Sequence, residues 1–315
     1  MLLYFYLPVL VLSAAVGACP TEEEPPCSCV PIGFHASTVT CLGVNNELDL
    51  KKSLVPMRSA LPIRQMEIFE SRFNFIPSDA FKGLKIPTLF IAACTLSSLS
   101  DSDVAFEGLE DSLEILKVHE TMLLNGWEWA QLRNLRSLRE IQAVKSGPLT
   151  VDEDIRDIAH LNIEKLSLVQ SELSHIDDTA FSTFHNLIVL SLKDNAISEL
   201  RRSMFPRPAT KLEMLLLSSN KIESIPDDLF SEMPALKTII LRGNQITTLS
   251  QEAFRPVWSN LKTFDFLETP LRCDCRISWI LKEKKFPLNT RGTCAEPDSL
   301  KGKKLVDLKT ANLVC

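Results

Sequence analysis

The sequence predicts an α/β solenoid, in which short parallel strands stack into one sheet and short helical turns and loops lie opposite it. Three observations predict this fold. Apolar side chains recur about every 25 residues through most of the chain. Four cysteines precede these repeats and four follow them. The chain also opens on an uncharged apolar segment, which is typical of proteins exported to an oxidising compartment.

The opening segment, residues 1–18, carries no charged side chain and ends in Val16, Gly17 and Ala18. This pattern indicates a signal peptide that is cleaved before Cys19. The alternative is an uncleaved membrane anchor, although the apolar run is short of the roughly 20 residues that span a bilayer. Because no later segment approaches that length, we expect a secreted protein of the extracellular space, without a transmembrane segment once the signal is removed.

The repeat is clearest in three consecutive units, which begin at Leu187, Leu212 and Leu236. Each has aliphatic residues at positions 1, 4, 6, 11 and 14 and an asparagine at position 9. Positions 3 to 7 predict a strand whose positions 4 and 6 face the core. Because one unit cannot bury these side chains alone, neighbouring units must stack. The same frame extends to units that begin at Ile63, Ile86, Leu113, Leu138, Ile163 and Leu261.

Position 9 must satisfy buried backbone groups, which favours asparagine. The earlier units have smaller side chains there, so we expect a less regular N-terminal half; these residues are Ser71, Cys94, Thr121, Ser146 and Ser171. Pro148 stands where position 11 requires a large aliphatic residue, which predicts a distorted fourth unit. We interpret Trp127 and Trp129 as core residues of the third unit.

This pattern resembles the extracellular leucine-rich-repeat family. The resemblance implies a curved horseshoe with a parallel β-sheet on the concave face, short helical turns and loops on the convex face, and disulfide caps at both ends. It divides the chain into a signal peptide at 1–18, an N-terminal cysteine cap at 19–62, and about eight repeats at 63–260. A last partial repeat and a C-terminal cysteine cap follow at 261–315.

Eight of the nine cysteines form two clusters, which indicate disulfide frameworks over the exposed ends of the core. The residues alone allow three connectivities in each cluster. The resemblance to the family's caps, clearest from Pro270 to Cys275, implies four pairs: Cys19–Cys29, Cys27–Cys41, Cys273–Cys294 and Cys275–Cys315. Zinc is the alternative, but structural zinc sites usually separate paired cysteines by two to four residues, and here one residue intervenes. Cys94 is left over. We interpret it as a buried thiol at position 9, with an intermolecular disulfide as the alternative.

No arrangement of residues indicates catalysis. The five histidines are scattered, and the chain has neither a metal-binding histidine motif, a phosphate loop nor a nucleophile elbow. Acidic and basic residues are intermixed at a net charge of −6, without the basic stripe of a nucleic-acid-binding protein. We therefore expect a non-enzymatic binding protein that uses no cofactor and no metal and does not bind nucleic acid.

The predicted concave face carries positions 3, 5, 7 and 8, which are mostly polar. Two apolar stretches interrupt this pattern and predict partner-binding sites. One contains Phe69 and Phe90, with Ala92 and Ala93. The other combines Val189, Met214, Leu216 and Ile240 on three adjacent strands, with Lys193, Arg242 and Asp265 at its rim. The alternative is that these are isolated surface residues, which are common on soluble proteins.

A narrower resemblance is carried by Ala18-Cys19-Pro20 and Pro26-Cys27-Ser28-Cys29. It is to secreted arthropod leucine-rich-repeat proteins similar to the non-catalytic subunit of luciferin 2-monooxygenase. Three hypotheses follow. The chain is a secreted protein that binds a protein or glycan on its concave face, or a non-catalytic subunit beside a separate catalytic chain in an extracellular enzyme complex. The third is an ectodomain held at the cell surface by another chain or by an uncleaved anchor.

Overall fold

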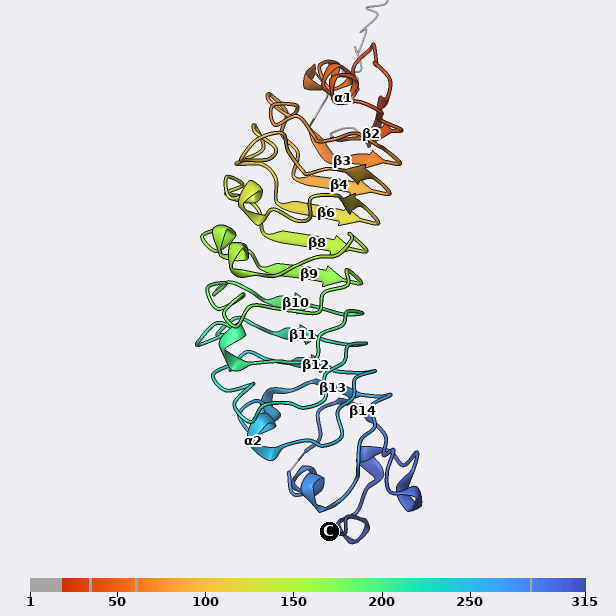
Figure 1. Cartoon of the computed structure of the whole chain (residues 1–315), viewed down its shortest axis with the longest axis vertical. Helices are drawn as coiled ribbons and strands as arrows, with labels where there is room; N and C mark the ends of the chain where they lie inside the picture. Colours follow the sequence, from red (N-terminus) through yellow and green to blue (C-terminus); the bar gives the residue numbers. More distant parts are fainter. Residues whose placement is uncertain (1–18, 34–35, 60–61, 284) are drawn as a thin grey trace, which may run out of the picture.

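The computed structural model describes residues 19–33, 36–59, 62–283 and 285–315. The predicted signal peptide, residues 1–18, lies outside the described residues. One long sheet of 12 strands runs through the molecule, and its strands follow one another in chain order (Figure 1). Its strands are β1 (Cys27–Ile32), β2 (Ala36–Leu42), β3 (Ile63–Phe69), β4 (Thr88–Ala92), β6 (Ile115–His119), β8 (Glu140–Val144), β9 (Lys165–Val169), β10 (Val189–Ser191), β11 (Met214–Leu216), β12 (Thr238–Ile240), β13 (Thr263–Phe266) and β14 (Asn289–Gly292).

The helical segments are short and interrupt the connections between strands. A second sheet of two strands pairs β5 (Thr95–Leu96) with β7 (Met122–Leu123). Within the described residues, the α-helices are α1 (Glu47–Ser53) and α2 (Gln251–Phe254). The 3-10 helices are η1 (Pro56–Ser59), η2 (Trp129–Leu132), η3 (Glu153–Ile158), η4 (Arg202–Met204), η5 (Trp258–Asn260), η6 (Cys275–Leu281), η7 (Asp298–Leu300), η8 (Leu305–Asp307) and η9 (Thr310–Asn312). The prediction of an α/β solenoid is confirmed.

The register of the sheet follows the repeat frame. From β3 to β13, each strand lies parallel to the next, and residues at position 4 of adjacent units are direct partners, as in Leu190 with Leu215 and Leu215 with Ile239. The side chains at positions 4 and 6 of all nine units are fully buried. Burying one such aliphatic side chain contributes about 1.5–3 kcal/mol. The stacked units therefore share a single continuous core.

The asparagines at position 9 join neighbouring units inside the core. The Nδ2 of Asn220 donates to the carbonyls of Leu192 (2.9 Å) and Leu217 (3.0 Å), which are position 6 of the preceding unit and of its own. Its Oδ1 accepts from the N–H of Ile197 at 3.1 Å. Asn195 and Asn244 make the corresponding bonds. One side chain thus satisfies backbone groups of two coils.

The lengths of the strands do not show the less regular N-terminal half that the sequence predicts. Strands β3 to β9 of the main sheet have five to seven residues each, whereas β10, β11 and β12 have three. Small polar side chains at position 9 still bond the backbone, as Ser146 does with the carbonyl of Val118 at 2.7 Å. In the asparagine units the backbone bonds between neighbours also reach position 7, as from Ser219 to the carbonyl of Arg242 at 2.7 Å.

Position 8 has a left-handed backbone in every unit, with φ between 47° and 69°. Its N–H donates to the carbonyl of position 7 in the next unit, for example from Glu120 to Val144 at 2.7 Å. This turn directs the chain away from the sheet. Only Gly243 is a glycine, and the other eight residues adopt a conformation that ordinary side chains disfavour. They are Glu70, Ala93, Glu120, Lys145, Gln170, Asp194, Ser219 and Glu268.

The remaining expectations for the core are confirmed. Pro148 is exposed and its neighbour Leu149 is buried in its place, which is the predicted distortion of the fourth unit. Trp127 and Trp129 are buried and stack with ring centroids 5.2 Å apart. Cys94 is a free, buried thiol, and burial raises its pKa. This favours the interpretation as a buried thiol.

At the N-terminal end, β1 covers the core as the outermost strand of the sheet. It pairs antiparallel to β2, the only antiparallel pair in the main sheet of the described residues. Disulfides join Cys19 to Cys29 and Cys27 to Cys41. The side chain of Glu23 accepts a hydrogen bond from the N–H of Cys29 at 2.8 Å. The end strand is therefore tied down by two disulfides and an acidic loop.

At the C-terminal end, disulfides join Cys273 to Cys294 and Cys275 to Cys315. All four pairs are those that the family resemblance implied. Trp279 of η6 lies against the last repeat, where its Nε1 donates to the carbonyl of Leu249 at 2.8 Å. Its ring lies 4.9 Å from that of Trp258. An aromatic cluster thus seals this end of the core.

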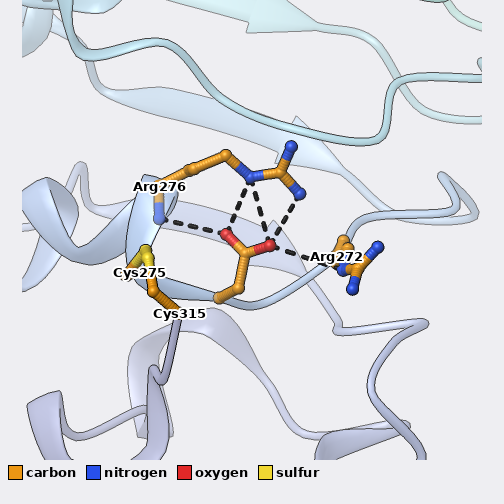
Figure 2. Close-up of a disulfide and its surroundings, with 5 residues drawn as sticks. Arg272, Cys275, Arg276 and Cys315 are labelled. Atoms are coloured by element: carbon orange, nitrogen blue, oxygen red, sulfur yellow. Dashed lines mark hydrogen bonds and ion pairs between the residues drawn. A yellow bond between two sulfur atoms is a disulfide. The ribbon is translucent and has the colours of Figure 1, made fainter.

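Asp274 holds the start of η6 beside the Cys275–Cys315 disulfide (Figure 2). Its carboxylate accepts from the backbone N–H of Arg276 at 3.0 Å and from the Arg276 guanidinium, and it forms an ion pair with Arg272 at 3.4 Å. The side-chain hydrogen bond from Arg276 lowers the pKa of Asp274 against the opposing effect of burial. The ionised carboxylate therefore stabilises the cap.

We predict that Asn220→Ala lowers the free energy of unfolding by about 3 kcal/mol, because it leaves buried backbone groups of two units without partners. Urea unfolding followed by circular dichroism measures this change. Asn162→Ala is the control, since Asn162 is exposed at the end of the fourth unit, and it should cost less than about 0.5 kcal/mol. Equal effects of the two substitutions would refute the bridging role of Asn220.

We predict that Asp274→Ala destabilises the C-terminal cap by about 1 kcal/mol at neutral pH, because it removes the cap of η6. Asp274→Asn should cost less, since it keeps the acceptor and loses only ion pairs whose arginine ends are more than half exposed. The folded-state pKa of Asp274 is lowered, so the charge contributes its stability above the unfolded pKa of about 4 and loses it as the pH falls through the folded-state pKa. Thermal unfolding of wild type and Asp274→Asn should therefore converge in acid; a difference that persists there contradicts this assignment.

Candidate partner-binding face

One face of the sheet is open, and it carries positions 3, 5 and 7 of each unit. We call it the open face; it corresponds to the predicted concave face. Its side chains alternate with the buried ones at positions 4 and 6, and most are partly exposed. Strands lie about 4.8 Å apart, so side chains at one position form columns across the units. The open face is therefore a continuous surface, and the residues at positions 3, 5 and 7 determine its chemistry.

The four predicted apolar residues lie together on the open face. Val189 of β10 is the direct partner of Met214 on β11, and Leu216 of β11 is the direct partner of Ile240 on β12. All four side chains are partly exposed. Because Met214 and Leu216 are two residues apart on one strand, they link the two pairs. We call these four residues the apolar patch.

The rim of the apolar patch differs in part from the prediction. Lys193 is partly exposed and Arg242 is exposed. Arg242 forms an ion pair with Glu268, in which its Nε lies 3.0 Å from Oε2. Asp265, which the sequence placed at the rim, is buried with 6% of its surface exposed. Its carboxylate turns back to accept from the N–H of Leu267 at 3.0 Å. The acidic side chain beside Arg242 is therefore Glu268, which sequence reasoning missed.

The second predicted stretch forms an aromatic cluster of Phe69, Phe90 and His119, on β3, β4 and β6. The rings of Phe69 and Phe90 meet edge to face at 5.3 Å, and that of Phe90 meets the His119 imidazole at 4.9 Å. Ala92 belongs to the same strand as Phe90, whereas Ala93 occupies the left-handed turn. Sequence reasoning missed His119, although its place at position 7, one strand from Phe90, was the available signal.

His119 is the one titratable member of the aromatic cluster. Its Nε2 lies 3.3 Å from Oε1 of Gln142 on β8. Burial lowers the pKa of His119, the hydrogen bond with Gln142 opposes this effect, and the charge of Lys117 adds to it. The imidazole is therefore held neutral at physiological pH, and the cluster presents an uncharged aromatic surface.

The described residues contain no group of three or more His, Cys, Asp or Glu side chains placed to hold a metal ion. His160, His175 and His185 belong to no such group, and His35 lies outside the described residues. Across the described part of the chain, no helix has the length and apolarity needed to cross a bilayer.

The repeat frame, the buried asparagines and the sealed ends define the fold of this chain as a leucine-rich-repeat solenoid. Residues 162–208 and 210–259 match the family model described as leucine rich repeat. The chain is similar to the Oplophorus-luciferin 2-monooxygenase non-catalytic subunit of Oplophorus gracilirostris. The two are 23% identical over 325 residues, which cover 93% of this chain and 87% of that protein.

Two further proteins are similar to this chain, one over less than half of its length and the other over most of it. Toll-like receptor 9 of Mus musculus is 30% identical over 149 residues, which are 46% of this chain and 14% of the receptor. Among solved structures, a chain of the octameric complex of Latrophilin 3, Unc5D and FLRT2, whose leucine-rich-repeat component is FLRT2, superimposes with a TM-score of 0.67 at 21% identity. It covers 91% of this chain and 92% of the other. That likeness establishes the fold.

We predict that the pKa of His119 lies below the usual value for histidine, and that two variants move it in opposite directions. Gln142→Leu should lower it further, because it removes the opposing hydrogen bond, and Lys117→Gln should raise it, because it removes a nearby positive charge. An NMR titration of the ring protons measures all three values. Since a lowered pKa disfavours the charged form in the fold, stability should fall as the pH drops below about 6.5. Shifts of the same sign in both variants would contradict the arrangement.

Proposed function

We propose that this protein is a secreted, non-catalytic binding protein whose open face recognises a macromolecular partner, either a protein or a glycan. The observation that carries this proposal is the apolar patch, which is contiguous across three strands. Its residues are Val189, Met214, Leu216 and Ile240. Covering such a patch removes apolar surface from water, at about 25 cal/mol per Å². Lys193 and Arg242 at its edge add charged groups that orient a partner.

The aromatic cluster supports a second contact region on the same face. Phe69 and Phe90 lie toward the N-terminal end of the sheet and the apolar patch lies toward the C-terminal end. Aromatic side chains are enriched where protein surfaces bind partners, because each buries a large area in a defined geometry. A partner that spans the sheet would contact both regions. The segments between them carry polar side chains such as Gln142 and Ser167.

A second candidate function is that of a non-catalytic accessory subunit in an extracellular enzyme complex. The observation in its favour is the similarity to the luciferin 2-monooxygenase non-catalytic subunit along 93% of this chain. This proposal includes only the role of a binding subunit. Under either proposal the four disulfides suit an oxidising extracellular compartment.

Purification from native extracellular fluid separates these proposals. A catalytic chain that remains at fixed stoichiometry through several columns favours the accessory subunit, and its absence favours the independent binding protein. Crosslinking mass spectrometry on the same material identifies the residues in contact. N-terminal sequencing tests the third hypothesis, because a start at Cys19 excludes an uncleaved anchor.

We predict that Met214→Asp/Leu216→Asp weakens capture of the native partner at least tenfold, about 1.4 kcal/mol or more, because it places charges in the apolar patch. The matched control is Met122→Asp/Leu124→Asp. It changes the same Met-Leu-Leu triplet where both side chains are exposed away from the patch. Quantitative mass spectrometry of the captured partner measures the effect. Undiminished capture by a folded patch variant would remove the apolar patch as the binding site.

A further inference from the structure

The C-terminal cap has a charge opposite to that of the rest of the chain. Residues 270–315 contain ten lysines and arginines and five aspartates and glutamates, a net charge of +5. The remaining residues contain 24 basic and 35 acidic side chains, a net charge of −11. Such an asymmetry gives the molecule a basic end, which attracts acidic partners and repels basic ones.

A groove lies at this basic end, between η5 and the segment that leads into β14. Its volume is about 690 Å³, and its apolar lining includes Trp258, Leu261, Phe286 and Leu288. We call it the cap groove. Leu288 is 88% exposed, the highest value among the exposed large hydrophobic residues of the described chain. None of these residues belongs to the apolar patch of the open face.

The floor of the cap groove is held firmly. Trp258 is 5% exposed, and its Nε1 donates to the carbonyl of Lys285 at 3.2 Å. The rings of Trp258 and Phe286 meet edge to face at 6.2 Å. The groove is therefore formed in advance, so a ligand that enters it need not order these side chains.

Three lysines line the cap groove: Lys262, Lys282 and Lys285. None of them forms an ion pair with a described residue, although charged side chains elsewhere pair between units, as Lys165 does with Glu140 at 3.2 Å. Glu283 is the only acidic side chain among the lining residues. The groove thus combines an apolar wall with positive charge that the protein itself leaves uncompensated.

We propose that the cap groove binds an acidic segment of a partner protein, which inserts a large apolar side chain against Leu288 and Phe286. Its carboxylates lie over Lys262, Lys282 and Lys285. A ligand of the cap groove must match both the apolar wall and the three lysines. A sulfated glycan would use the lysines and leave Leu288 uncovered. A membrane surface requires apolar side chains that project together, whereas these line a hollow. A peptide with one apolar anchor and flanking acids satisfies both features.

Fluorescence anisotropy with the purified full-length protein tests this proposal. The probe is a labelled peptide with one phenylalanine flanked by aspartates and glutamates. Two comparison peptides replace the phenylalanine by glycine or the acidic residues by lysines. We expect the acidic peptide with the anchor to bind at least tenfold more tightly than either comparison peptide. Its affinity should fall as the salt concentration rises. Equal binding of all three peptides, or none, overturns the proposal.

The variant Lys285→Glu/Leu288→Asp should weaken the acidic peptide at least tenfold. The matched control is Leu48→Asp/Lys52→Glu, which makes the same changes at exposed positions of α1 at the other end of the solenoid. It should leave the affinity within twofold. Leu288→Ser alone, at a side chain too exposed to support the fold, should still weaken binding severalfold. No effect of the cap-groove variants overturns the proposal.

Two more measurements identify other ligands and separate this proposal from the function of the open face. The first measurement is binding of heparin and of vesicles containing phosphatidylserine. If either binds, if Lys285→Glu/Leu288→Asp abolishes that binding, and if the acidic peptide does not bind, the proposal is overturned in favour of that ligand. Met214→Asp/Leu216→Asp should bind the acidic peptide normally. Failure of one site therefore leaves the result at the other unchanged.

Discussion

The structure depends on the fact that no coil can bury its own apolar side chains. Residues at positions 4 and 6, such as Leu190 and Leu192, are fully buried only because the next unit covers them. The asparagines impose the same dependence on the backbone, since Asn220 satisfies groups in two units at once. Stability is therefore a property of neighbouring pairs. The two ends, which lack a neighbour on one side, require disulfide caps.

This constraint also explains why binding chemistry gathers on the open face. Positions 4 and 6 are committed to the core, and position 8 is committed to a left-handed turn. Positions 3, 5 and 7 carry neither demand, so their side chains can vary without loss of the fold. The apolar patch and the aromatic cluster occupy these free positions. The fold fixes their spacing, while the individual residues determine what they bind.

Much of the fold could be predicted from the sequence because its determinants repeat. The frame of nine units placed Val189 beside Met214 and Leu216 beside Ile240. What escaped prediction depends on single side chains or on turns. Asp265 is buried and bonds its own backbone two residues on, and strands β10 to β12 end at position 5, short of the predicted position 7. The left-handed turns carry mostly Glu, Lys and Gln, which give no local signal. The cap groove joins residues that no repeat relates.

The antiparallel end strand has a consequence for the behaviour of the protein in concentrated solution. A stack of parallel strands has no inherent stopping point, and an uncovered edge is a template for another chain. Here β1 reverses direction, is fastened by two disulfides, and has the N–H of Cys29 bonded to Glu23. An incoming strand would meet an occupied donor and negative charge. The fold thereby resists joining end to end into fibrils, and the length of each molecule is set by its own repeats.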